Sequence, residues 1–153
     1  MPRSAGSRVL IERGERFVAI KPFASRFEWE IHILPLRHEA DFLKASREDL
    51  EDFARVLRRT MARLDKVVGG VQYNFFLHSV PHGSEFGDCQ PSYHWHLEIC
   101  PRTSIPTGFE LGSGLFVSTI SPEDAAEQLR AVELDGGIEV PGHGARELEA
   151  RRV

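Results

Sequence analysis

Three side chains suited to metal or phosphate chemistry alternate along one short segment of the chain, at His94, His96 and Glu98. Read as a β-strand, the segment places all three on one face and Trp95 and Leu97 on the other, because successive side chains point to opposite faces. Two imidazoles and a carboxylate on a rigid strand can hold a metal ion or carry out histidine-centred phosphate chemistry. The alternative is a polar outer sheet face that uses histidine without a function.

A metal site would take a third imidazole from a neighbouring strand. The aromatic run 73–78 reads as a strand that ends at His78, and a loop rich in glycine and proline leads from it to His94. Strands connected in this way often pair as antiparallel neighbours. We therefore expect one divalent zinc or iron ion per chain, bound to His78, His94 and His96. Glu98 would complete a four-ligand shell or orient one of the imidazoles from outside it.

His96 also permits a catalytic role. A neutral imidazole is a nucleophile at physiological pH, so His96 could attack phosphorus and take up a nucleotidyl group. A nitrogen bound to a metal cannot do so, and the two roles therefore exclude one another. A third reading makes the two histidines and Glu98 a two-histidine, one-carboxylate set for redox iron or copper chemistry. A long helix in the sequence argues against the all-β barrel that often houses such sites.

Composition excludes several classes of function. The 153 residues suffice for one domain with a core, and 19 basic against 23 acidic residues give a net charge of -4. This balance provides no field that would attract nucleic acid or an anionic membrane. Cys89 and Cys100 form no C-x-x-C pair and are expected to be reduced thiols. Without an apolar leader or a stretch of about 20 apolar residues, the sequence predicts a cytoplasmic protein.

The elements that position these side chains begin with a sheet. Two short apolar runs at 9–12 and 17–20 flank a charged turn and predict a hairpin, and 28–34 alternates as a third strand. A long helix is predicted from its N-cap Ser46 to Val68, just before a pair of glycines. Its apolar residues recur at helical spacing, so it should pack on the sheet.

The second half of the chain adds shorter elements. Residues 115–119 look like a further strand, and Ser121 caps a short helix with proline at its first position. The stretch 135–153 is charged and glycine-rich without periodicity, which is typical of a loose tail or an arm onto a partner. We therefore expect an α+β protein with one domain over 1–134. It should contain about five antiparallel strands, one long helix packed on them and a short carboxy-terminal helix.

The order of these motifs resembles the histidine-triad (HIT-like) superfamily. More closely, it is similar to the carboxy-terminal half of galactose-1-phosphate uridylyltransferases and related sugar-phosphate nucleotidylyltransferases. The similarity covers about residues 8–132 of this chain. The segments that carry it are 27–38, 73–74, 94–102, 108–110 and 121–130.

The resemblance implies nucleotidyl transfer between a nucleotide sugar and a sugar phosphate. It makes Gly108, Phe109 and Glu110 the segment that contacts the sugar, with the glutamate bonding sugar hydroxyls. On the residues alone, the glycines of this segment could equally be turn glycines.

The resemblance also implies a structural zinc or iron ion at the positions of His78, His94 and His96. Transferases of this kind contain two histidine-triad-like halves, and the first half supplies a nucleophile in a His-Pro-His-Gly-Gln motif that this chain lacks. We therefore expect a homodimer or a separate first-half protein as partner, with Glu98 in place of the absent carboxylate ligand. The alternatives are a non-catalytic metal-binding module and a HIT-type nucleotide hydrolase that uses His96.

Overall fold

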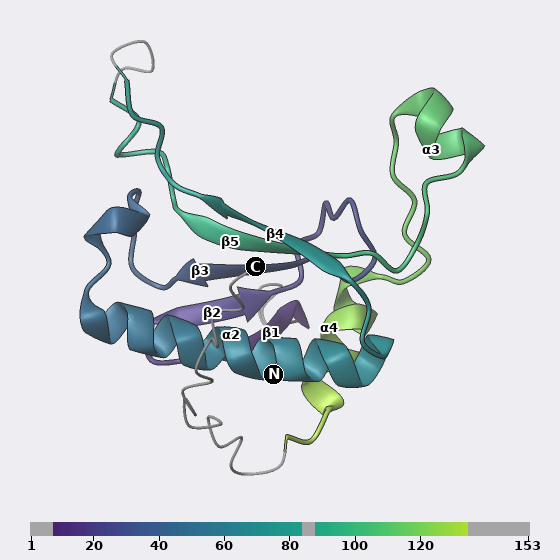
Figure 1. Ribbon diagram of the computed structural model, residues 1–153, viewed down its shortest axis with the longest axis horizontal. Helices are drawn as coiled ribbons and strands as arrows, with labels where there is room; N and C mark the ends of the chain where they lie inside the picture. Colours follow the sequence, from purple (N-terminus) through teal and green to yellow (C-terminus); the bar gives the residue numbers. More distant parts are fainter. Residues whose placement is uncertain (1–7, 84–87, 135–153) are drawn as a thin grey trace, which may run out of the picture.

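The framework of the protein is an antiparallel sheet with the strand order β1-β2-β3-β5-β4 (Figure 1). The computed structural model describes residues 8–83 and 88–134. Although β4 precedes β5 in the sequence, β4 forms an edge and β5 lies between β3 and β4. The strands are β1 (Leu10–Arg13), β2 (Phe17–Ile20), β3 (Ile31–Pro35), β4 (Tyr73–His78) and β5 (His96–Pro101).

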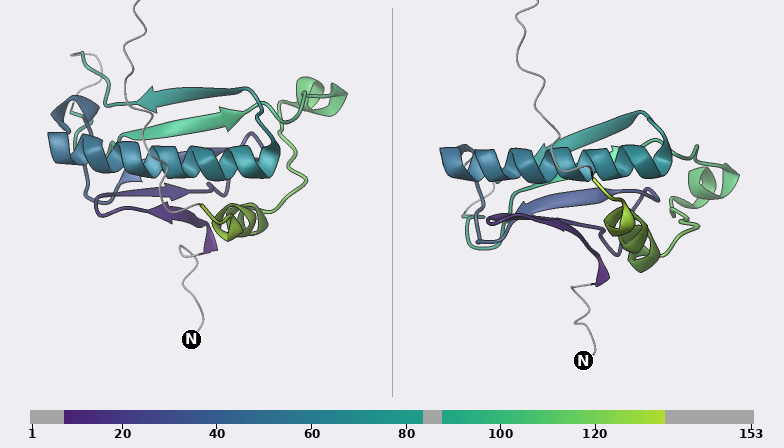
Figure 2. Two further views of the ribbon diagram at one scale, coloured as in Figure 1. Left: turned by 60° about the horizontal axis from the view of Figure 1, so that its bottom comes forward. Right: turned by 90° about the horizontal axis from the view of Figure 1, so that it is seen from below.

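The long helix α2 (Arg47–Val68) covers one face of this sheet (Figure 2). Ser46 and Asp49 form a capping box at its N-terminus, in which the side chain of each accepts a hydrogen bond from the backbone N–H of the other. The helix ends at Gly69, whose φ of 75° is favourable for glycine. A one-turn 3₁₀ helix, η1 (Phe42–Lys44), precedes it. The predicted bounds of the long helix are confirmed.

Beneath α2 the sheet presents its apolar face. Trp95 is 1% exposed, and its ring lies with centroid distances between 5.1 and 5.7 Å from the rings of Phe17, Phe42 and Phe53. Large aromatic side chains contribute much of the free energy of such a core. The predicted placement of Trp95 and Leu97 on the apolar face is confirmed. His96 and Glu98, which alternate with Leu97 along β5, therefore point away from the helix.

A carboxylate of α2, that of Asp52, binds the turn of the β1–β2 hairpin. Oδ2 of Asp52 accepts hydrogen bonds from the backbone N–H of Arg16, at 2.8 Å, and of Phe17, at 3.1 Å. Gly14 lies against the same group, since a Cβ there would stand 2.4 Å from this oxygen. The turn can therefore approach the helix only with glycine at this position.

Two helices follow β5: α3 (Gly108–Ser113) and α4 (Pro122–Ala131). The predicted N-cap Ser121 of α4 is confirmed, because its side chain accepts from the backbone N–H of Asp124. The guanidinium of Arg63 in α2 holds the other end of α4. It donates to the carbonyl oxygens of Leu129, Arg130 and Val132.

Three predicted elements differ from the structure. The third strand begins at Ile31 and not at Glu28, because the backbone N–H of Glu30 donates to the carbonyl of Phe27 in a turn before the strand. Residues 115–119 form no strand. The backbone N–H and hydroxyl of Thr119 instead donate to Glu28, which ties this segment to the loop before β3. The histidine strand begins at His96 and not at Tyr93, because the backbone N–H of Trp95 donates to the carbonyl of Glu39 outside the sheet.

The predicted α+β architecture is confirmed, with five strands, one long helix and a short carboxy-terminal helix. Among the helices in residues 8–83 and 88–134, none is long and apolar enough to cross a membrane. The predicted tail, 135–153, lies outside the described residues, so the extent of the domain stays a prediction.

Candidate functional site

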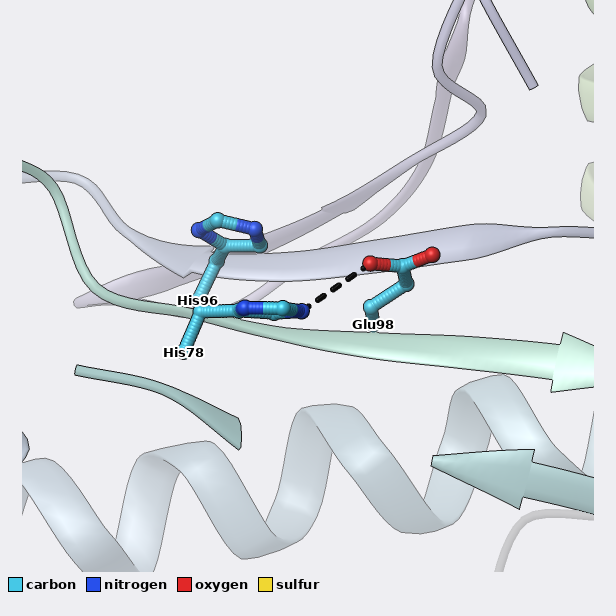
Figure 3. Close-up of side chains that lie close together, drawn as sticks. All are labelled: His78, His96 and Glu98. Carbon is cyan, nitrogen blue, oxygen red and sulfur yellow. Dashed lines mark hydrogen bonds and ion pairs between the residues drawn. The ribbon is translucent and has the colours of Figure 1, made fainter. Parts of the chain in front are cut away.

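The candidate functional side chains gather on the sheet face opposite α2. In the register of the sheet, His78 of β4 pairs with His96 of β5, and Glu98 of β5 pairs with His32 of β3. Figure 3 shows His78, His96 and Glu98 close together, with α2 on the other side of the sheet. The predicted antiparallel pairing of the two histidine strands is therefore confirmed.

His78, His96 and Glu98 are close enough to bind one ion. Nε2 of His78 lies 3.1 Å from Oε2 of Glu98, and the rings of His78 and His96 stack with centroids 4.8 Å apart. One possible ligand atom from each of the three residues lies within 4.8 Å of the other two. Zinc and non-haem iron accept imidazole nitrogen and carboxylate oxygen as ligands. The donor set therefore fits either metal.

The orientation of the His96 ring is fixed by its own strand. Nδ1 lies 3.1 Å from the carbonyl oxygen of His94, so Nδ1–H donates to that oxygen and Nε2 keeps its lone pair. Burial lowers the pKa of His96, and the neighbouring imidazoles of His32 and His78 lower it further. A neutral imidazole with a free Nε2 can bind a metal or attack phosphorus.

His94 stands apart from this group. Its Nε2 lies 2.9 Å from the carbonyl oxygen of Pro35, to which the ring donates, and its Nδ1 lies 3.5 Å from Nδ1 of His38. The structure thus brings together three of the four predicted metal ligands and does not bring His94 to them. A ligand role for His94 stays a prediction that requires its ring to turn.

Glu30 and His32, which are not among the predicted site residues, lie beside the site. The ring of His32 stacks on that of His96 with centroids 5.2 Å apart, and Nε2 of His32 lies 3.0 Å from Oε1 of Glu30. Burial alone would raise the pKa of Glu30, but hydrogen bonds from His32 and from the backbone of Arg26 and Phe27 hold it below its usual value. The alternation of Glu30 and His32 is the sequence signal that could have placed both on this face.

The predicted sugar-contact segment lies beyond the other end of β5. Gly108, Phe109 and Glu110 open α3, which projects from the sheet in Figure 1, whereas His96 is the first residue of β5. Oε2 of Glu110 accepts from the backbone N–H of Thr107 at 2.9 Å and from its hydroxyl at 2.6 Å. These hydrogen bonds lower the pKa of Glu110 and cap its helix. Contact of the segment with a sugar stays a prediction.

Two known proteins with similar sequences are considerably longer than this chain. It is 32% identical over 139 residues to a galactose-1-phosphate uridylyltransferase of Thermotoga maritima, a match that covers 86% of this chain and 43% of that protein. It is 31% identical over 126 residues to an ADP-glucose phosphorylase of Arabidopsis thaliana, covering 82% and 35%. No family model matches the chain. The chain therefore spans less than half the length of these relatives.

Solved structures agree with the sequence comparison. An ADP-glucose phosphorylase from Arabidopsis thaliana with bound ADP-glucose superposes with a TM-score of 0.72 and 30% identity, over 82% of this chain and 41% of that chain. A zinc-bound histidine triad family protein from Mycobacterium smegmatis gives a TM-score of 0.53 and 22% identity, over 80% and 81%. At that identity the second likeness shows the fold alone, and the fold is HIT-like.

Proposed function

Because the chain matches the C-terminal half of galactose-1-phosphate uridylyltransferase-like proteins and has the HIT-like fold, we propose that it serves nucleotidyl transfer between a nucleotide sugar and a sugar phosphate. The names of the relatives supply these substrate classes. The observation that carries the proposal is the convergence of His78, His96 and Glu98 on an accessible sheet face. We assign the chain the role of the metal-binding half of such a transferase.

In this role, His78, His96 and Glu98 would hold one zinc or iron ion, with His94 as a further ligand if its ring turns away from Pro35. A bound ion of this kind would contribute a fixed positive charge and rigidity between β4 and β5. The carbonyl of His94 orients the His96 ring and leaves Nε2 available, so that this nitrogen would bind the ion. Nε2 of His78 lies within hydrogen-bond distance of Oε2 of Glu98, which keeps the second imidazole beside the carboxylate; a bound ion would replace the proton between these two atoms.

The second candidate function is a HIT-type nucleotidyl transferase or hydrolase in which His96 is the nucleophile. The free lone pair on Nε2 and the lowered pKa of His96 favour it. Nε2 would attack the α-phosphorus of a nucleotide sugar, forming an N–P bond while the P–O bond to the departing sugar phosphate breaks. A sugar phosphate or water would then attack the same phosphorus and restore the imidazole.

One experiment separates the two functions. The protein is stripped of metal, loaded or not loaded with zinc, and incubated with UDP-glucose labelled at the α-phosphorus. The metal-binding role predicts stoichiometric zinc and no covalent label in either sample. The nucleophile role predicts label on the metal-free wild type and none on His96→Ala. Both functions would be contradicted by a protein that binds no zinc and acquires no covalent label.

The sugar would contact the segment Gly108, Phe109 and Glu110. Glu110 lines a cavity of about 160 Å³ together with Glu28 and Thr119, next to the loop before β3. Its ionised carboxylate can accept hydrogen bonds from sugar hydroxyls. Loss of nucleotide-sugar affinity in Glu110→Gln, with unchanged zinc binding, would support this assignment.

We further propose that a second copy of this chain covers the outer side of β4. This edge strand contains no charged residue, and with α2 it forms an apolar groove of about 280 Å³. Two copies related by a twofold axis would present the same apolar edge to each other. A separate first-half protein is the other possible occupant. The groove is lined by Phe53, Leu57 and Met61 of α2 and Tyr73, Phe75 and Leu77 of β4.

A further inference from the structure

A second set of metal-binding donors lies next to the first, on the β3 side of the sheet. Glu30, His32 and Glu98 each offer a ligand atom within 4.8 Å of the other two. Glu98 therefore belongs to both sets, with His78 and His96 on one side and with Glu30 and His32 on the other. The stacking of His32 on His96, at 5.2 Å, makes the two sets contiguous.

The loop before β3 holds Glu30 in a position suited to an ion. Oε2 of Glu30 accepts the backbone N–H groups of Arg26, at 2.7 Å, and Phe27, at 3.2 Å. These bonds occupy one oxygen and leave Oε1 facing His32 at 3.0 Å. Because Glu30 is 3% exposed, bulk water gives little stabilisation to its charge.

The buried lysine of this loop does not neutralise Glu30 by direct contact. Its ammonium, on Lys21, donates to the hydroxyl of Ser25 and to the carbonyl of Phe27. Among the described residues, the close ion-pair partner of Glu30 is His32. A divalent cation would be a stronger counter-charge for a buried carboxylate than an imidazole that is charged only when protonated.

We propose that Glu30, His32 and Glu98 form a second divalent-cation position, with Glu98 bridging it to the ion of the first set. Carboxylates have two oxygens and can bridge ions that lie roughly 3.5–4 Å apart in two-metal sites. The five residues would supply three ligand atoms to each ion, one oxygen of Glu98 going to each, and would leave coordination positions open on both ions. Two divalent ions would also change the charge of this face from negative to positive, as required to bind a phosphate group.

This second position rests on the proposed metal role only through the shared Glu98. Metal analysis with zinc tests it: the protein is stripped, incubated with excess zinc, freed of unbound metal and analysed for zinc per chain. We expect two ions in the wild type, one in His32→Ala and one in His78→Ala. His82→Ala is the matched control and should retain two, because His82 lies outside both sets and is exposed.

Cobalt substitution supplies a readout of proximity. Two Co²⁺ ions bridged by Glu98 should show magnetic coupling in the wild type, and His32→Ala should show the signal of one isolated ion. His32→Gln, which keeps a side chain of similar size, should behave as His32→Ala, and both should unfold like the wild type when chelator is present.

The outcomes separate this inference from the proposed function. One ion in the wild type and the same single ion in His32→Ala would overturn the second position and leave the first intact. Two ions without magnetic coupling would contradict the bridging role of Glu98. No bound zinc in the wild type would contradict both sites.

Discussion

His78 and His96 face each other across the β4–β5 pair, with ring centroids 4.8 Å apart and planes inclined by 21°. Two imidazoles in this arrangement can turn their nitrogens toward one point with little backbone movement. Two imidazolium ions there would repel each other, and burial already favours the neutral form of His96. The strand pairing thus presents two imidazoles to an ion, and in His96 a nitrogen donor whose neutral form is favoured.

Zinc should stabilise the folded protein through this pair. At a free zinc concentration about 100 times Kd, a single site adds about 2.7 kcal/mol to the free energy of unfolding. Thermal unfolding with zinc and with chelator should show this difference as a shift in Tm. His78→Ala should lose the part of the shift that comes from the ion held by this pair. The exposed His82→Ala should keep it, and equal shifts in both variants would contradict the ligand role of His78.

Asp52→Ala should destabilise the protein by about 1 to 3 kcal/mol, because it leaves the buried backbone N–H of Phe17 and the partly buried one of Arg16 without an acceptor. Urea unfolding at pH 7 measures the loss. Glu51→Ala, on the exposed side of the same helix, is the control and should change stability by less than about 0.5 kcal/mol. A similar loss in the two variants would show that the hairpin does not depend on Asp52.

The same carboxylate makes stability depend on pH. Burial opposes ionisation of Asp52, but hydrogen bonds from the backbone of Arg16 and Phe17 and from Arg55 hold its pKa below the usual value. A lowered folded-state pKa means that its contribution is present above the unfolded-state pKa of about 3.9 and is lost as the pH falls through the folded-state value. The stability difference between wild type and Asp52→Asn should therefore shrink below about pH 4. A difference that stays constant down to pH 2 would argue against it.

Gly14→Ala should destabilise the hairpin, since its Cβ would stand 2.4 Å from Oδ2 of Asp52 and 2.8 Å from the side chain of Val56. Forcing an extra methyl group into a packed region costs about 1–3 kcal/mol. Gly112→Ala is the matched control, because its Cβ meets open space within a helix. That variant should be neutral or more stable by up to about 1 kcal/mol. Chemical denaturation compares the two.

Phe75→Lys should convert a dimer to a monomer. Phe75 is 62% exposed on β4, and a lysine there would place a charge at the centre of the proposed interface. Sedimentation velocity measures the mass, and Leu111→Lys, an equally apolar exposed position on α3, should leave the dimer intact. A monomeric wild type that forms a stable complex with a separate first-half protein would identify the other occupant.

Elements with local signals could be predicted from the sequence. The bounds of α2 follow from Ser46 and Gly69, whose capping chemistry acts within a few residues. The placement of His78 beside His96 also followed, because a loop between two consecutive strands favours antiparallel pairing.

The positions of other residues depend on contacts distant in the sequence. His94 lies outside the site because the backbone N–H of Trp95 donates to the carbonyl of Glu39, and the strand starts only at His96. Residues 115–119 have the composition of a strand, but their segment is tied to Glu28. The short helix α3 did have a local signal, the capping pair Thr107 and Glu110, but the glycines of the segment favoured a turn.

Arg63 determines from which side the described chain leaves the domain. Its guanidinium binds three terminal carbonyls of α4 and the carboxylate of Glu12, so the last turn of α4 is attached to α2. Nζ of Lys66 in α2 also donates to the carbonyl oxygen of Glu133. The described chain therefore ends beside α2, whereas the imidazoles of His78 and His96 lie on the opposite face of the sheet (Figure 3). A linker joined after residue 134 could immobilise the protein on a sensor surface while leaving the imidazole face open to dissolved metal and nucleotide.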